Sequence, residues 1–213
     1  YRGVYGDMRD DDGLLRIDYP DNVQELDVYS LTRAKSEEEL EALERLSRGT
    51  FDLLHAGDRV EEKSFRGADS AKDLKSAFET TKSLGFTQYR GGLQDELGRC
   101  SDLTRVVAHT PEWEDRIQRV YKGLKEVESN LRPGVGKDEL NEIFMKHLDP
   151  AKDVVYGPPI HHTDFRGYSM HYDIDKLDEF DFVTVGAHVG DGKETAVINT
   201  RGVSIRAPPE NPY

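Results

Sequence analysis

Four histidines in the last third of the chain have types and spacing that suit metal chemistry. His161 and His162 are adjacent, Asp164 and His171 follow closely, and His188 lies further along. Imidazole nitrogens and one carboxylate could form a mononuclear metal site of the hydrolase type. Adjacent residues on a strand point to opposite faces, so at most one of His161 and His162 can join His171 at a single metal. Structural hydrogen bonding is the alternative expectation for these side chains.

The single cysteine restricts the chemistry further. Cys100 is the only thiol in the chain. A disulfide framework needs pairs of cysteines, and a cysteine-based zinc site needs at least two thiolates. We therefore interpret Cys100 as a small buried hydrophobe.

Four helices are expected to position these residues. Ser36 followed by three glutamates is a capping box, and Thr110 followed by Pro111 is a typical helix start. Apolar residues at helical spacing follow both signals, and two further segments show the same periodicity. The predicted helices span residues 36–57, 70–85, 110–132 and 137–147.

Strands are predicted in the remaining ordered segments. A turn-linked pair is expected between residues 86 and 109, and short β-like runs are expected at 154–156, 182–189, 195–200 and 203–206. The order is two helices then strands, repeated once. This order predicts an α+β fold in which a curved antiparallel sheet carries two pseudo-symmetric helix pairs on one face.

The ends of the chain differ in composition from its centre. Residues 1–27 form an acidic arm with little periodicity, residues 28–206 hold the predicted domain, and residues 207–213 are a proline-rich tail. Such ends become ordered most easily against a partner.

Charge limits the classes of partner. The chain has 42 acidic and 29 basic residues, a formal net charge of -13. This charge repels phosphate backbones, so general nucleic-acid binding is not expected. No apolar stretch is long enough to span a bilayer, so we expect a soluble, intracellular protein without membrane insertion. The first residue is Tyr1 rather than Met, which is compatible with an organelle if an upstream segment is removed.

Three segments, in this order, resemble the creatinase, prolidase and aminopeptidase P family of pita-bread metallopeptidases. Residues 31–40 (LTRAKSEEEL) resemble the opening of the family's first helix. Residues 101–105 (SDLTR), with Tyr121 and then 131–135 (LRPGV), resemble its Ser-Asp-(Ile/Leu)-Thr-Arg strand and Lys-Pro-Gly turn. Residues 161–167 (HHTDFRG), with His171, resemble its His-Gly-Thr-Ser-His signature. The resemblance implies a shortened member with the pita-bread fold.

The resemblance also implies which metal ligands are present. Family catalysis uses two divalent ions held by two Asp, one His and two Glu, which activate a bound water. Two of these positions keep a carboxylate here, Asp102 and Glu194. The other three fall on residues without a side-chain donor, Gly91, Phe165 and Gly186. His161, His162 and His171 then correspond to vestigial substrate-cleft histidines.

These losses favour a pseudoenzyme that holds no metal and no cofactor. Two carboxylates cannot replace five ligands, so we expect a structural or protein-binding subunit, within a larger assembly of other proteins. Without metal, Asp102 and Glu194 are expected to pair with Arg105 or Arg99 or to face solvent. The resemblance also keeps a chaperone-like role for basic proteins open. The alternative is a metal-dependent peptidase with a rearranged site of Asp102, Glu194, His162 and His171.

Overall fold

The structure, a computed structural model, describes residues 34, 36–55, 75–94, 99–163, 170–171 and 175–207. The expected arm at residues 1–27 and all but the first residue of the tail at 207–213 lie outside these ranges, as do Asp164 and Phe165. The elements, in chain order, are α2 (Glu37–His55), β1 (Lys75–Lys82), β2 (Phe86–Gln94), β3 (Leu103–Ala108), α3 (Pro111–Ser129), α4 (Lys137–Met145), β4 (Val154–Tyr156), β5 (Ile160–Thr163), β6 (Met170–His171), β7 (Phe182–Gly190) and β8 (Thr195–Ser204).

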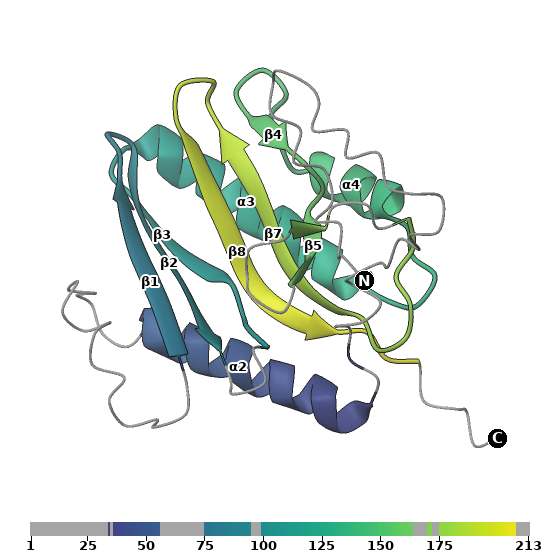
Figure 1. Cartoon of the computed structure of the whole chain (residues 1–213). Coiled ribbons are helices and arrows are strands. Elements are labelled where there is room, and N and C mark those ends of the chain that lie inside the picture. Colours follow the sequence, from purple (N-terminus) through teal and green to yellow (C-terminus); the bar gives the residue numbers. More distant parts are fainter. Residues whose placement is uncertain are drawn as a thin grey trace, which may run out of the picture.

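The strands form two antiparallel sheets that lie edge to edge. One has the order β1-β2-β3, and the other has the order β4-β7-β5-β6 with β8 paired to β7. Polar contacts join β8 to the first sheet: the Asn199 amide donates to Thr104 Oγ1 at 2.8 Å and the Val197 amide donates to Gln88 Oε1 at 2.7 Å. Figure 1 shows the strands side by side as one curved layer.

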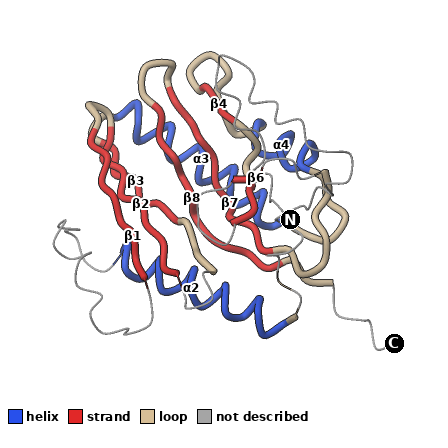
Figure 2. The backbone as a smooth tube through the Cα atoms, in the orientation of Figure 1, coloured by secondary structure: helices blue, strands red, loops and turns tan. Residues whose placement is uncertain are grey.

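The helices pack on one side of this layer, as the tube view also shows (Figure 2). One face of α3 is buried with the inward residues of β7 and β8. The largest fully buried side chains there are Phe86, Phe144, Leu124, Leu140, Ile160, Leu177 and Ile198. The same apolar periodicity that predicted the helices therefore forms the core. No helix among the described residues is long and apolar enough to cross a membrane.

The helix starts predicted at Ser36 and Thr110 are confirmed. Ser36 Oγ accepts from the amide of Glu39 at 3.3 Å, and three glutamates occupy the first turn of α2. Thr110 Oγ1 accepts from the amide of Trp113 at 3.3 Å, with Pro111 in the first turn of α3. These bonds satisfy amides that the helix itself leaves without acceptors.

The helix predicted over residues 70–85 is wrong. Residues 75–82 form β1, which pairs with β2 through eight register pairs from Lys75–Gln94 to Lys82–Thr87. The spacing of Ala77, Phe78 and Thr81 suits a helix, but Thr80 and Thr81 are β-branched and favour a strand. Pairing with β2 stabilises residues 75–82 as a strand rather than a helix, and this pairing cannot be predicted from local periodicity.

The fold class itself is confirmed as mixed α+β with antiparallel sheets. In the second half, α3 and α4 form the expected helix pair. In the first half, α2 is the single helix among the described residues 34–108. The helix expected to pair with it, over residues 70–85, is replaced by β1 in the part that the structure describes.

Candidate functional site

The centre of the candidate site is an ion pair between two neighbouring strands. Arg90 on β2 lies opposite Thr104 on β3, and Asp102 is two residues before Thr104, so Arg90 and Asp102 share a face. Arg90 donates through Nε to Oδ1 of Asp102 at 2.8 Å and through a terminal nitrogen to Oδ2 at 2.6 Å. Asp102 is only 7% exposed. Bidentate guanidinium–carboxylate pairs of this kind are among the strongest side-chain hydrogen bonds.

A third donor to the same carboxylate comes from β8. Asn199 is buried and donates through Nδ2 to Oδ2 of Asp102 at 3.1 Å. Its backbone amide is held by Thr104 Oγ1, which fixes its position. The Asp102 carboxylate therefore accepts three hydrogen bonds from protein groups.

Two histidines lie on the same face of the sheet. His161 on β5 is paired with Thr184, and burial lowers its pKa to about 4, although the charge of Asp102 acts in the opposite direction. Burial and then the nearby Arg90 charge lower the pKa of His188. Both imidazoles are neutral at pH 7.

His162 points to the other side of β5, as the alternation predicted. Its neighbour Ile160, on the same face two residues earlier, packs in the core beneath α3. The Nε2 atom of His162 lies 3.6 Å from Oδ2 of Asp181. His171 is the backbone partner of His162 in the β5–β6 pair, and its side chain lies outside the described part of the structure.

The two glycines at candidate ligand positions lie within the sheet. Gly91 pairs with Leu103 on one side and with Phe78 on the other. A Cβ at Gly186 would lie 2.2 Å from Oδ1 of Asn199 and 2.8 Å from the Ile198 carbonyl oxygen. Asn199 thus fills the space that a carboxylate side chain at residue 186 would need.

Glu194 does not join Asp102, as the alternative of a rearranged metal site would require. The Glu194 side chain accepts from the amides of Leu84 and Gly85 at 3.0 and 3.1 Å, and from Ser83 Oγ at 3.2 Å. It caps the turn between β1 and β2. The residue of β8 that faces Asp102 is Asn199.

The arginine that holds Asp102 was also missed. We expected Arg105 or Arg99, but the bidentate partner is Arg90, and Arg105 donates to the Leu54 carbonyl oxygen at 3.4 Å. The signal available in the sequence was a basic residue on the strand preceding the Ser-Asp motif. Its register with that motif required the structure.

The side chains at this site do not fit the two metal ions that the resemblance implies. Within the described ranges, no group of three or more His, Cys, Asp or Glu side chains could hold a metal ion. The strongest candidate ligand, Asp102, is already bound by a guanidinium and an amide. Phe165 and Asp164 cannot be placed in the site because they lie outside the described residues.

Sequence comparisons identify no relatives: no protein-family model and no curated protein matches the chain. Solved structures do match in fold. The prolidase from Pyrococcus horikoshii OT3 has a TM-score of 0.65 at 15% identity, covering 83% of this chain and 62% of its own. The X-Pro aminopeptidase from Thermotoga maritima MSB8 has a TM-score of 0.60 at 16% identity, covering 84% and 62%.

A third match is the N-terminal domain of the FACT complex subunit SPT16 from Cicer arietinum (chickpea). It has a TM-score of 0.59 at 12% identity, covering 82% of this chain and 57% of its own. The chain spans less than two thirds of the length of each of these three structures. At these identities the likeness concerns the fold, and this chain has the pita-bread fold found in prolidases and X-Pro aminopeptidases.

Proposed function

We propose that this chain is a catalytically inactive protein with a peptidase fold that acts as a structural or protein-binding subunit. The observation that carries the proposal is the bidentate Arg90–Asp102 pair. The resemblance places a metal ligand at Asp102, and the structure supplies a guanidinium there as the counter-ion.

The charge of Arg90 opposes any divalent ion at this position. Two unit charges about 4 Å apart repel by roughly 4 kcal/mol at an effective dielectric constant of about 20, and a divalent ion doubles this to about 8 kcal/mol. A metal would also have to displace the hydrogen bonds from Arg90 and Asn199 to Asp102. Binding is therefore expected to be weaker by several orders of magnitude than in a site with five ligands.

The alternative metal-dependent peptidase loses two of its four expected ligands. Glu194 is bound to the β1–β2 turn, and His162 points to the helix side of the sheet. His161 and His188 are neutral imidazoles on the same face as Asp102, so they are the donors on which such a site would have to depend. Arg90 lies among them.

A subunit role is supported by the nature of one structural match. The FACT subunit SPT16 has an N-terminal domain of similar fold, and by its description it belongs to a complex. The net charge of -13 suits a partner of mixed charge.

The catalytic part of the proposal is tested by peptide hydrolysis. Xaa-Pro dipeptides and Xaa-Pro-Xaa tripeptides are incubated with the full chain in manganese, cobalt or zinc, beside an Asp102→Ala variant. We expect no turnover above the level of the variant in any metal. Turnover that Asp102→Ala abolishes would establish the peptidase instead.

The subunit part is tested separately, in the source cells. Size-exclusion chromatography and quantitative mass spectrometry of the native protein are expected to find it in one complex with other chains at constant stoichiometry. A native protein that elutes only at its monomer mass would refute this part.

A further inference from the structure

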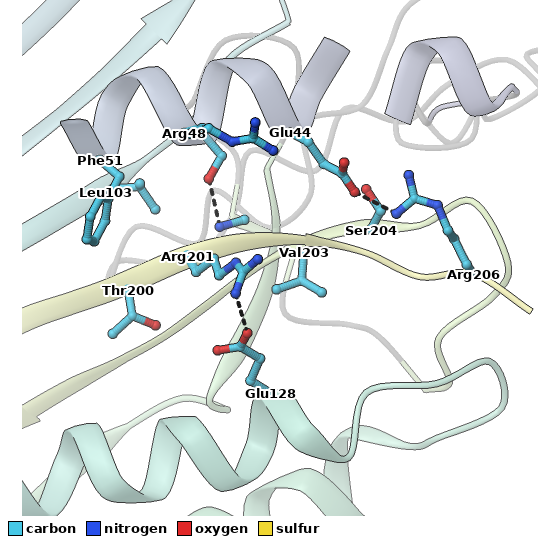
Figure 3. Close-up of a pocket in the computed structure, with 12 residues that line it drawn as sticks. Glu44, Arg48, Phe51, Leu103, Glu128, Thr200, Arg201, Val203, Ser204 and Arg206 are labelled. Carbon is cyan, nitrogen blue, oxygen red and sulfur yellow. Dashed lines mark hydrogen bonds and ion pairs between the residues drawn. The ribbon is translucent and has the colours of Figure 1, made fainter. Parts of the chain in front are cut away.

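A groove on the helix side of the sheet is separate from the site at Asp102. It encloses about 470 Å³ between α2 and α3, and β8 forms its floor. Figure 3 shows the helices on either side of the strand and the side chains that project between them. A volume of this size lies within the range of small-ligand sites and holds a few side chains of a bound segment.

A β-bulge explains why Asn199 and Arg201 on β8, two residues apart, point to opposite faces of the sheet. The β7–β8 register shifts between Val185 and Gly186, so that Asn199 pairs with Gly186 and Arg201 pairs with Val185, leaving Thr200 as the extra residue. A bulge of this kind re-aims the side chains that follow it. Asn199 therefore points toward Asp102, and Arg201 points toward α3, where it donates to Glu128 at 2.8 Å.

The groove carries an excess of positive charge in an acidic protein. Three arginines and two glutamates line it. Arg201 pairs with Glu128, and Arg206 donates to Glu44 at 2.6 Å. Arg48 on α2 has no ion pair within 4 Å among the described residues. Burial raises the pKa of the nearby Glu44 carboxyl, but the hydrogen bond from Arg206 and the charges of Arg206 and Arg48 outweigh burial and lower this pKa. A guanidinium is thus available to an incoming carboxylate.

The groove also has an apolar end. Phe51 is 46% exposed, and Leu103 lies beside it, as Figure 3 shows. Glu44, Ser204 and Arg206 lie toward the opposite end of the groove. An occupant is therefore expected to combine an apolar group with an acidic one.

We propose that this groove binds a short segment of a partner protein in which an aromatic or aliphatic residue lies beside acidic residues. The apolar side chain packs on the exposed Phe51, and a carboxylate binds Arg48. The inference rests on the protein-binding part of the proposed function and specifies its surface. It does not depend on the state of Asp102, which faces the other side of the sheet.

The test uses the full chain and a fluorescein-labelled hexapeptide, Glu-Glu-Phe-Leu-Glu-Glu, in a polarisation titration. We expect saturable binding that weakens about tenfold with Arg48→Glu and changes less than about twofold with Arg45→Glu. Arg45 is the matched control because it lies on the same helix, is 65% exposed and does not line the groove. Phe51→Ala is expected to weaken binding as well, and ¹⁵N spectra should show peptide-induced shifts at residues 200–204.

Three results would overturn the inference: no saturable binding at low salt, equal weakening by Arg45→Glu and Arg48→Glu, or equal affinity for Lys-Lys-Phe-Leu-Lys-Lys. Circular dichroism of each variant verifies that α2 is intact. Failure here would leave the peptide-hydrolysis and native-complex tests unaffected, so the two proposals can fail separately.

Discussion

Two buried aspartates, Asp153 and Asp102, are each held by arginine, yet their surroundings differ. The Asp153 side chain has no exposed surface and accepts from Arg116 at 3.0 Å and from Arg119 at 2.8 and 2.9 Å. It also accepts from the Asp149 amide at 2.9 Å. Asp102 has one arginine and one amide.

The neighbours of the two aspartates explain the difference. Arg116 and Arg119 both lie on α3, and Asp153 lies between α4 and β4, so the cluster ties α3 to the segment that follows α4. Arg116 also lies over the Trp113 ring, 4.7 Å from its centroid. Asp102 instead lies among neutral histidines on the opposite face of the sheet. One cluster is a structural clamp, and the other is a polar site with its charge neutralised.

The largest expected loss of stability comes from removing Asp153, and it distinguishes this buried cluster from exposed ion pairs. Asp153→Ala removes the buried carboxylate that two guanidinium groups share, and we expect it to lower the free energy of unfolding by about 3–5 kcal/mol in urea titrations. Asp115→Ala is the matched control, since Asp115 pairs with the same Arg119 but is 67% exposed. Its expected cost is below about 1 kcal/mol. Equal losses for the two variants would remove the distinction between a clamp and a surface pair.

The second prediction uses pH to separate the regions. Burial lowers the pKa of His161 to about 4 from 6.5, so the unfolded chain binds a proton in this interval that the folded chain does not. The free energy of unfolding should therefore fall, by up to about 3 kcal/mol, as pH drops from 6.5 to 4. Unfolding titrations at several pH values should show a shallower dependence for His161→Gln.

Asp153 titrates in a different interval. Burial raises the pKa of this carboxyl, but the hydrogen bonds from Arg119 and the Asp149 amide outweigh burial and hold it below 3.8. Its contribution is present above pH 3.8 and is lost as pH falls through the folded pKa. The pH dependence between 6.5 and 4 is thus assigned to His161. A His161→Gln variant whose free energy of unfolding keeps the wild-type dependence on pH in this interval would contradict that assignment.

A smaller loss of stability is expected when the Arg90–Asp102 pair is broken. Arg90→Met leaves a buried carboxylate with Asn199 as its remaining donor, and the expected loss is about 2 kcal/mol because Arg90 is partly exposed. The double variant Arg90→Met with Asp102→Leu should recover most of this loss, since two apolar groups replace both charges. Thermal unfolding of the three proteins measures the coupling. A double variant less stable than Arg90→Met alone would show that the pair is a clamp like Asp153.

The features that depend on neighbouring residues in the sequence, such as helix starts, could be predicted. The features that depend on how distant strands pair could not. The starts of α2 and α3 follow from Ser36 and Thr110, because caps act within one helical turn. Asp102 was found through its motif. Residues 75–82 were misassigned, and Arg90 and Asn199 were missed, because each depends on strand register across the sheet.

The proposed inactivity depends most on Arg90, which binds the Asp102 carboxylate that a metal would need, and calorimetric titration of the full chain with manganese tests this directly. We expect no saturable binding of Mn²⁺ up to millimolar concentrations, for the wild type and for Asp102→Ala alike. Stoichiometric binding of two Mn²⁺ ions per chain that Asp102→Ala abolishes would contradict it.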